Sequence, residues 1–173
     1  MIYMGLGANL PGPHGVAPRD TILMALTEVE VAGVCVTGVS CCYKSKPVPA
    51  SDQPDYVNAV AALKTGLAPG PLLDLLHEVE ARLGRKRLAR NGARDIDLDL
   101  LDYHGQCNAD WPVLPHPRMA GRAFVLRPLL DLAPEWRHPI SGKSAVKLLA
   151  AAADRADLQL LVSGSDKKPP QGS

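Results

Sequence analysis

The sequence predicts an α+β sandwich, in which helices pack on a sheet without a regular alternation of strand and helix. Strand-like and helix-like segments are intermixed along the 173 residues with no βαβ repeat. No glycine-rich dinucleotide-binding motif follows the first strand-like segment, because Asn9 and Pro11 stand where a helix would have to begin. Apolar residues make up 46% of the chain, enough for a sizeable core. We therefore expect one folded domain over residues 1–163, followed by a polar, disordered tail over residues 164–173.

Composition and charge exclude several classes of protein. The chain has 19 Lys and Arg residues against 18 Asp and Glu residues, which argues against a strongly basic nucleic-acid binder and an acidic disordered chain. Aromatic residues amount to only 4%, too few for an aromatic surface that reads single-stranded bases. The four cysteines form no CxxC pair, which indicates reduced thiols rather than a disulfide framework or a zinc site. No apolar run approaches the length of a membrane span, so we expect a soluble, cytoplasmic protein.

In the first half of the chain we expect three strands, a helix and two long loops. Residues 2–8 are apolar and end in small side chains, which predicts a buried strand, and a loop rich in proline and glycine follows. Asp20 is a suitable N-cap for a helix, because aliphatic residues recur at helical spacing after it. Residues 34–43 and 56–64 are typical of strands, and residues 44–55 form the loop between them. The buried face of the helix should consist of Ile22, Ala25, Leu26 and Val29.

The second half predicts three more helices and two strands. One helix has Pro69 and Pro71 in its first turn and ends at Gly84, a residue that favours helix termination. Residues 118–132 and 143–153 are expected to be helical, and residues 158–163 are expected to form the last strand. The buried stripe of the helix that begins near Pro69 should consist of Leu72, Leu76, Val79 and Leu83.

The strand expected over residues 95–103 carries the strongest signal for function. Alternation puts three aliphatic side chains on one face and Asp95, Asp97 and Asp99 on the other. Residues 82–94, directly before this strand, contain six basic side chains and no acidic one. Carboxylates that share a strand face repel one another unless a lysine, an arginine or a divalent metal lies among them. Oxygen ligands two residues apart suit Mg²⁺, and an arginine-rich loop beside Mg²⁺ suits polyphosphate transfer.

Five segments carry a resemblance to a known family, and they follow one another in the family's order. They are GLGANL at residues 5–10, DQPDYVN at 52–58, GARDIDLD at 92–99, LPHPRM at 114–119 and RAFVLRPL at 122–129. Each motif alone is a weak signal, but five in order are specific. On these segments, which span about residues 2 to 132, the chain resembles the 6-hydroxymethyl-7,8-dihydropterin pyrophosphokinases of folate biosynthesis.

The resemblance implies a fold and a reaction. The expected fold is a single-domain αβα sandwich around a mainly antiparallel sheet with a ferredoxin-like core. The expected reaction transfers the β,γ-diphosphate of MgATP to the hydroxymethyl group of the pterin and releases AMP. The family's two metal-binding aspartates fall on Asp97 and Asp99, which would bind two Mg²⁺ ions, and Asp95 falls on a position that the family does not reserve for an acid. ATP and a dihydropterin are the implied partners of a monomer that binds neither nucleic acid nor membrane.

The resemblance also assigns the remaining site residues. Arg85 and Arg94 are expected to contact the phosphates during catalysis. Pterin binding maps onto Ser45, Val48, Tyr56, Asn58 and Phe124. Of these, Tyr56 and Phe124 are expected to sandwich the ring, and Asn58 can both donate and accept hydrogen bonds. Nucleotide binding maps onto His77, Glu80, Arg87, His116 and Arg122.

The chain departs from the family pattern in places that concern the nucleotide and the loops. Asn91 stands where a tryptophan is frequent, Ala93 replaces a proline, Lys46 replaces a proline of the pterin loop, and Trp111 and Val113 replace an arginine and a hydroxyl residue. Three alternatives stay open: an RNA-binding α+β module, a Mg²⁺-dependent nuclease using the same carboxylates, and a paralogue of low activity. An assay of AMP formation from ATP and the dihydropterin separates these readings.

Overall fold

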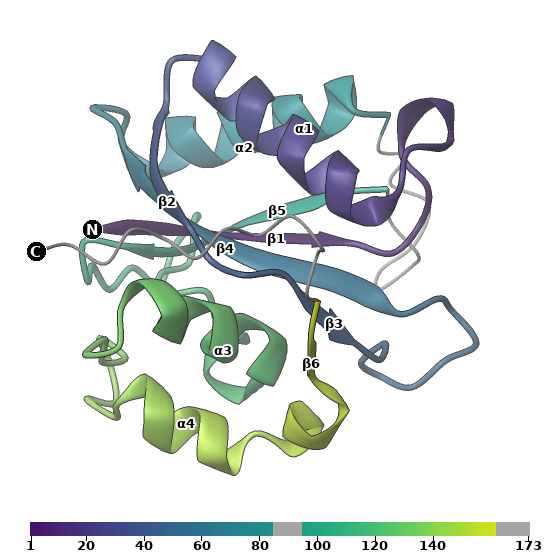
Figure 1. Cartoon of the computed structure of the whole chain (residues 1–173). Helices are drawn as coiled ribbons and strands as arrows, with labels where there is room; N and C mark the ends of the chain where they lie inside the picture. The colour runs from purple at the N-terminus through teal and green to yellow at the C-terminus, as the bar shows by residue number, and fades with distance from the viewer. Residues whose placement is uncertain (85–94, 162–173) are drawn as a thin grey trace, which may run out of the picture.

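A six-stranded antiparallel sheet lies at the centre of the computed structural model, which describes residues 1–84 and 95–161 (Figure 1). The strands are β1 (Ile2–Ala8), β2 (Cys35–Val39), β3 (Tyr43–Ser45), β4 (Tyr56–Lys64), β5 (Asp97–Tyr103) and β6 (Gln159–Leu160). The strand order is β5-β1-β4-β3-β6, and β2 also pairs with β4. One helix connects β1 to β2 and another connects β4 to β5, which with this strand order is the path of a ferredoxin-like core.

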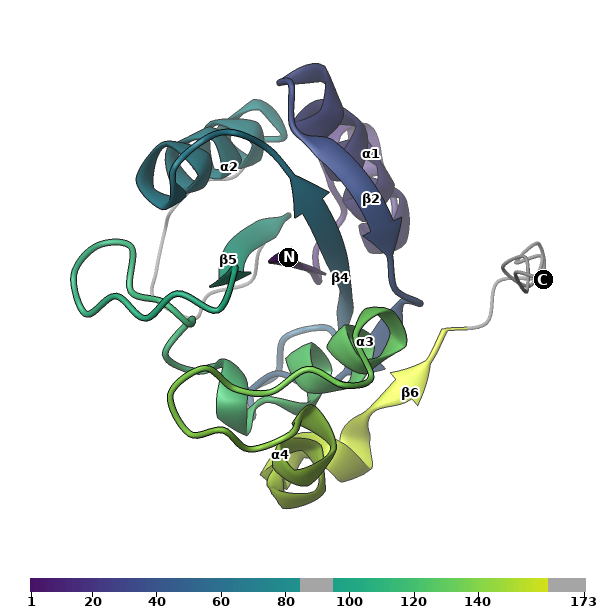
Figure 2. The ribbon, with the colours of Figure 1, turned by 90° about the vertical axis from the view of Figure 1, so that its left-hand side faces the viewer.

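Helices cover both faces of the sheet, as the α+β sandwich requires (Figures 1 and 2). One face packs against α1 (Pro18–Val31) and α2 (Pro69–Arg82), and the other packs against α3 (Ala123–Leu132) and α4 (Ala145–Ala151). The buried helical stripes are those that the spacing predicts, and Gly84 follows α2 with a φ of +88°. Short 3-10 turns complete the described chain at Pro13–Gly15, Met119–Gly121 and Ala153–Asp157.

Alternation along β1 divides its side chains between two cores. Its even-numbered residues join the core beneath α1 and α2, and Tyr3 joins the core beneath α3. Gly5 and Gly7 lie on the same face as Tyr3 but carry no side chain. The α3 face of the sheet is therefore filled at the Tyr3 end and hollow at the Gly7 end.

A β-bulge in β5 interrupts the expected period of two. Met4 pairs with Leu100 and Tyr3 pairs with Asp102, so Leu101 is the extra residue. Leu100 joins the core beneath α1 and α2, whereas Leu101 joins the core beneath α3. The alternation holds from Asp97 to Leu100 and ends at the bulge.

Several element boundaries differ from the sequence prediction. Residues 34–43 form two strands rather than one, with residues 40–42 between them. There the Ser40 Oγ accepts a hydrogen bond from the Val60 N–H, in the place of a backbone carbonyl. Asp20 is not the N-cap: α1 begins at Pro18, whose ring fixes a helical φ, and Asp20 lies in the first turn.

The expected helix over residues 118–132 is also interrupted. Arg122 is extended, with φ −115° and ψ 108°, and separates a 3-10 turn from α3. The next helix is shorter than expected, because the Ser144 side chain caps α4 by accepting from the Lys147 N–H. The last strand, β6, is only two residues long within the described part of the chain. The tail over residues 164–173 lies outside the described residues.

Candidate active site

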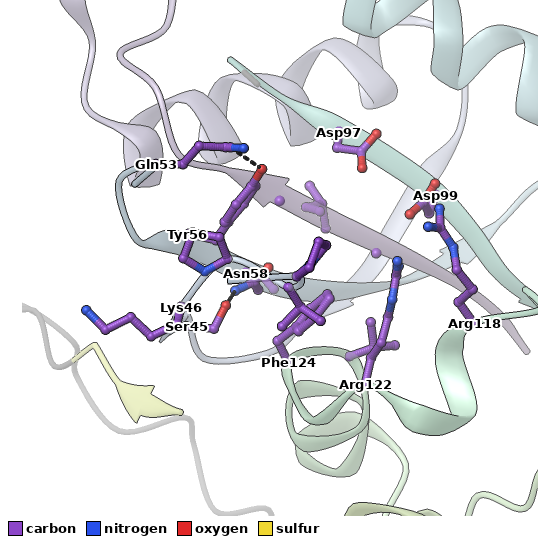
Figure 3. Close-up of a pocket in the computed structure, with 18 of the residues that line it drawn as sticks. Ser45, Lys46, Gln53, Tyr56, Asn58, Asp97, Asp99, Arg118, Arg122 and Phe124 are labelled. Carbon is purple, nitrogen blue, oxygen red and sulfur yellow. Dashed lines mark hydrogen bonds between the residues drawn. The ribbon is translucent and has the colours of Figure 1, made fainter. Parts of the chain in front are cut away.

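A cavity of about 360 Å³ lies over the hollow end of the sheet (Figure 3). Its floor is formed by β1, β4 and β5, and its walls come from the loop after β3 and the segment that leads into α3. The lining includes Ser45, Val48, Tyr56, Asn58, Asp97, Asp99, Arg122 and Phe124, all predicted from the sequence, together with Lys46, Gln53 and Arg118, which were not assigned to the site.

Strand register brings the polar side chains of the floor into one row. Gly7 pairs with Asp97 on one side and with Asn58 on the other, and Asn58 pairs in turn with Tyr43. Residues paired across antiparallel strands share a face, so the side chains of Asp97 and Asn58 lie on the same face on either side of Gly7. The glycine leaves the space between them open. A Cβ at residue 7 would lie 3.5 Å from Asn58 Oδ1.

Asn58 is buried and its amide orientation is fixed by the protein. Its Nδ2 donates to Ser45 Oγ at 2.9 Å and to the Tyr43 carbonyl at 3.3 Å. The two donor protons of Asn58 are thus used within the protein, and Oδ1 is the atom that can accept a hydrogen bond from a ligand.

Two aromatic rings border the same part of the cavity. The hydroxyl of Tyr56 donates to Gln53 Oε1 at 3.2 Å, and Asn9 Nδ2 donates to the same oxygen at 3.2 Å. Phe124 lies in the first turn of α3, packs partly against the core and has the Arg122 guanidinium 5.3 Å from its ring centroid. The rings come from β4 and α3, so their separation depends on how the helix packs on the sheet.

Asp97 and Asp99 project from β5 into the other end of the cavity (Figure 3). Both side chains are half-buried, and they lie on one strand face with a single residue, Leu98, between them in the sequence. In the described part of the chain, no group of three or more His, Cys, Asp or Glu side chains could hold a metal. Two carboxylates in an open cavity nevertheless fit Mg²⁺, which takes one or two protein carboxylates and completes its shell with water and phosphate.

His116 lies beside this carboxylate pair. Its backbone N–H donates to the Leu101 carbonyl at 2.8 Å, and its Nε2 is 3.8 Å from Asp99 Oδ2. Burial lowers the pKa of His116, the nearby Arg122 and Arg118 lower it further, and Asp99 opposes them. Because Nδ1 accepts from the Arg118 N–H at 3.2 Å, the neutral ring carries its proton on Nε2. His116 thus presents an N–H donor toward the carboxylate end of the cavity.

Like His116, the predicted residues His77 and Glu80 are not among those that line the cavity. His77 is half-buried on α2, and Glu80 is almost completely buried, with Oε1 accepting from the Leu98 N–H at 2.7 Å. This bond braces β5 from the helix side, so the contact of Glu80 that the structure displays is with the strand. Arg85, Arg87 and Arg94 lie outside the described residues.

Lys46, Gln53 and Arg118 are polar cavity residues that the sequence analysis does not assign to the site. Gln53 and Arg118 belong to the motifs DQPDYVN and LPHPRM, and Lys46 follows the assigned Ser45. A basic side chain two residues after His116 was the available signal for Arg118.

Comparison with protein families matches residues 3–134 to the family described as 7,8-dihydro-6-hydroxymethylpterin-pyrophosphokinase (HPPK). The chain belongs to the HPPK family. The resemblance carried by the five motifs is confirmed, and with it the activity: the protein is a pyrophosphokinase that transfers a pyrophosphoryl group from ATP to hydroxymethyldihydropterin in folate synthesis. The family uses MgATP.

Individual HPPK relatives cover most of the chain. A 2-amino-4-hydroxy-6-hydroxymethyldihydropteridine pyrophosphokinase of Pseudomonas aeruginosa is 45% identical over 153 residues, which are 87% of this chain and 90% of the relative. The enzyme of the same name from Haemophilus influenzae is 38% identical over 159 residues, covering 91% and 96% of the two chains. The folic acid synthesis protein fol1 of Pneumocystis carinii is 36% identical over 88% of this chain, which spans only 20% of that longer protein.

Solved structures support the fold. A Plasmodium falciparum HPPK-DHPS triple mutant with SDX-DHP matches with a TM-score of 0.69 at 12% identity, covering 92% of this chain and 47% of that one. The expected α+β fold with an antiparallel sheet is thereby confirmed. No helix in the described ranges, 1–84 and 95–161, has the length and apolar character to cross a membrane.

Proposed function

We propose that the cavity divides the two substrates between its ends, with the dihydropterin at the β3–β4 end and the phosphates of MgATP at the β5 end. The observation that carries this proposal is the row across the floor. Asn58 and the two aromatic rings lie at one end, Asp97 and Asp99 lie at the other, and Gly7 leaves the space between them open. A pterin held against Asn58 would point its hydroxymethyl group toward the carboxylates.

At the pterin end, the roles follow from hydrogen-bonding capacity and shape. Asn58 Oδ1 accepts from an N–H of the pterin, because its own amide protons are held by Ser45 and Tyr43. Tyr56 and Phe124 stack on the two faces of the ring, and Val48 contributes apolar surface from the loop after β3. These contacts exclude water and fix the orientation of the ring.

At the phosphate end, we assign Asp97 and Asp99 as ligands of two Mg²⁺ ions that accompany ATP. When bound, the metal ions withdraw charge from the phosphate oxygens and orient the triphosphate. His116 donates from Nε2 to a phosphate oxygen, and Arg122 offers a charged donor where the pterin and phosphate regions meet. Arg85, Arg87 and Arg94, together with His77 and Glu80, stay assigned to catalysis and nucleotide binding by the family pattern alone.

The reaction is a displacement at the β-phosphorus. The hydroxymethyl oxygen forms the new P–O bond, the bond between the β-phosphorus and the oxygen bridging it to the α-phosphorus breaks, AMP departs with that oxygen, and the hydroxyl proton passes to solvent. The contribution of this chain to the step is alignment, since both ends of the cavity are built on one rigid sheet.

Asp97→Asn and Asp99→Asn test the metal assignment. Each variant should lower AMP formation by at least about a hundredfold and weaken Mn²⁺ binding, measured by electron paramagnetic resonance in the presence of a non-hydrolysable ATP analogue. Melting temperatures should stay the same or rise, because the repulsion between the carboxylates is relieved. Asp95→Asn is the matched control, since Asp95 precedes the same strand but does not line the cavity. Near-normal AMP formation in either variant would overturn the assignment.

A further inference from the structure

Arg118 is a cation of the cavity whose role neither the sequence motifs nor the family assignment defines. Its backbone is held in place, because its N–H donates to His116 Nδ1 and the next residue, Met119, is completely buried. Its side chain is exposed to the cavity, and Figure 3 shows it extending from the segment before α3 toward Asp99. The backbone of Arg118 is therefore fixed, and its long charged side chain extends to the carboxylate end of the cavity.

The other cations that line the cavity in the described chain have different placements. Lys46 Nζ is 2.9 Å from Asp55 Oδ1, in the loop between β3 and β4. The Arg122 guanidinium lies over the ring of Phe124, next to the expected pterin site. Among these described cations, Arg118 is the one that reaches toward the carboxylates without lying over an aromatic ring.

We propose that Arg118 is a phosphate-binding residue for the transferred diphosphate, and that it competes electrostatically with Mg²⁺ at Asp99 until the nucleotide arrives. The proposal rests on the assignment of Asp97 and Asp99 as metal ligands. Without nucleotide, a guanidinium directed toward a carboxylate makes the approach of a second cation less favourable. With nucleotide, the phosphates supply negative charge for both cations, and the planar guanidinium suits two phosphate oxygens at once.

If so, removing the Arg118 side chain should change the affinity for metal alone and the affinity for nucleotide with metal in opposite directions. Metal alone should bind more tightly, because a competing positive charge is gone. Nucleotide with metal should bind more weakly, because a phosphate donor is gone. A residue that only supports the local fold would weaken both kinds of binding together.

The experiment compares Arg118→Ala with Arg118→Lys and with Arg155→Ala, which removes the same charge from an exposed site on the 3-10 turn Ala153–Asp157. Mn²⁺ alone is titrated by electron paramagnetic resonance. The Mg²⁺ complex of α,β-methylene ATP, which cannot release AMP, and the dihydropterin are each titrated by calorimetry. Melting curves accompany every variant.

In Arg118→Ala, we expect nucleotide affinity to fall about 10- to 100-fold, as for the loss of a charged hydrogen bond, and Mn²⁺ affinity to rise about two- to fivefold. Pterin affinity should change less than about twofold. Arg118→Lys should keep the metal affinity of the parent and lose part of the nucleotide affinity, and Arg155→Ala should match the parent.

Nucleotide affinity within about twofold of the parent, or weaker binding of Mn²⁺ alone, would overturn the proposal for Arg118. Failure of the underlying metal assignment is recognised separately, because Asp99→Asn would then leave Mn²⁺ binding unchanged whatever Arg118→Ala does to the nucleotide.

Discussion

Single residues decide which atoms the cavity offers to a ligand. Asn58 is an acceptor only because Ser45 Oγ and the Tyr43 carbonyl hold both of its amide protons. Phe124 has two environments, since it packs partly against the core and also lines the cavity. Both residues line the cavity, Asn58 from β4 and Phe124 from α3.

Phe124→Ala tests the stacking role directly. Stacking on one face of a flat bicyclic ring contributes about 1–3 kcal/mol, so pterin affinity should fall roughly 10- to 100-fold. Affinity for MgATP should change little, because Phe124 lies at the end of the cavity that we propose for the pterin. Calorimetric titration of each ligand, beside a melting curve, gives the answer. A large drop in melting temperature with unchanged pterin affinity would instead mean that Phe124 serves mainly the core.

At the scale of elements, α3 holds the short strand β3 in position. The hydroxyl of Tyr43 donates to both oxygens of Asp131, at 2.9 and 3.1 Å, and Arg127 pairs with the same carboxylate at 3.1 Å. The Cys41 N–H donates to Asp131 as well. Because β3 also carries Ser45 and the carbonyl that orients Asn58, this contact between helix and strand supports the β3–β4 end of the cavity.

Tyr43→Phe should lower the free energy of unfolding at neutral pH. The same substitution should also make the loss of stability at alkaline pH smaller. Burial, followed by the hydrogen bond to Asp131, raises the pKa of Tyr43 above the ordinary value of 10.0. The unfolded chain therefore releases this proton first, so the stability that the bond supplies is complete below about pH 10 and declines as the pH rises further. We expect a loss of about 1–2 kcal/mol at pH 7 and a shallower decline above pH 10.

Urea unfolding of the parent and Tyr43→Phe at pH 7, 9 and 10.5 measures both effects. Tyr103→Phe is a control at pH 7 for the loss of a buried tyrosine hydroxyl, which there donates to the Leu67 carbonyl at 2.7 Å. An alkaline decline equally steep in the parent and in Tyr43→Phe would contradict the prediction.

At the scale of the whole molecule, a buried carboxylate joins the sheet to the α3–α4 layer. Asp102 follows the bulge in β5 and accepts from Trp136 Nε1 at 2.7 Å and from the Gly105 N–H at 2.8 Å. Asp102 and Trp136 are 3% and 9% exposed, so water cannot replace a lost partner readily. The bulge places both Leu101 and Asp102 toward α3 and thus sets the wall of the cavity.

Trp136→Phe should destabilise the protein without altering its chemistry. Removing the indole N–H from a buried carboxylate costs about 1.5–3 kcal/mol, which lowers the melting temperature of a chain of this size by roughly 3–10 °C. The turnover number measured well below the melting temperature should stay within about twofold of the parent. Trp111→Phe changes the exposed tryptophan and should leave the melting temperature unchanged. Equal melting temperatures for the parent and Trp136→Phe would show that the hydrogen bond is dispensable.

Much of the fold and part of the site could be predicted because they depend on local patterns. The alternation of residues 2–8, the helical stripes and the two aspartates on one face of β5 follow from side-chain periodicity, which each segment carries by itself. The split at Ser40 and the break at Arg122 could not be predicted, since each follows from contacts with distant parts of the chain or from a backbone conformation that many residues can adopt.

The family, the reaction and the pairing of two carboxylates on one strand face could be predicted from the sequence alone, because five ordered motifs and a period-two strand need no knowledge of distant contacts. Only the tertiary structure shows which atoms line the cavity and which are used within the protein. The hydrogen bonds of Asn58 depend on β3, the contact of Glu80 with β5 depends on the packing of α2, and the position of Arg118 depends on the turn before α3. Hydrogen bonds and burial of this kind join residues far apart in the chain, so they exist only once the sheet and its two helical layers have assembled.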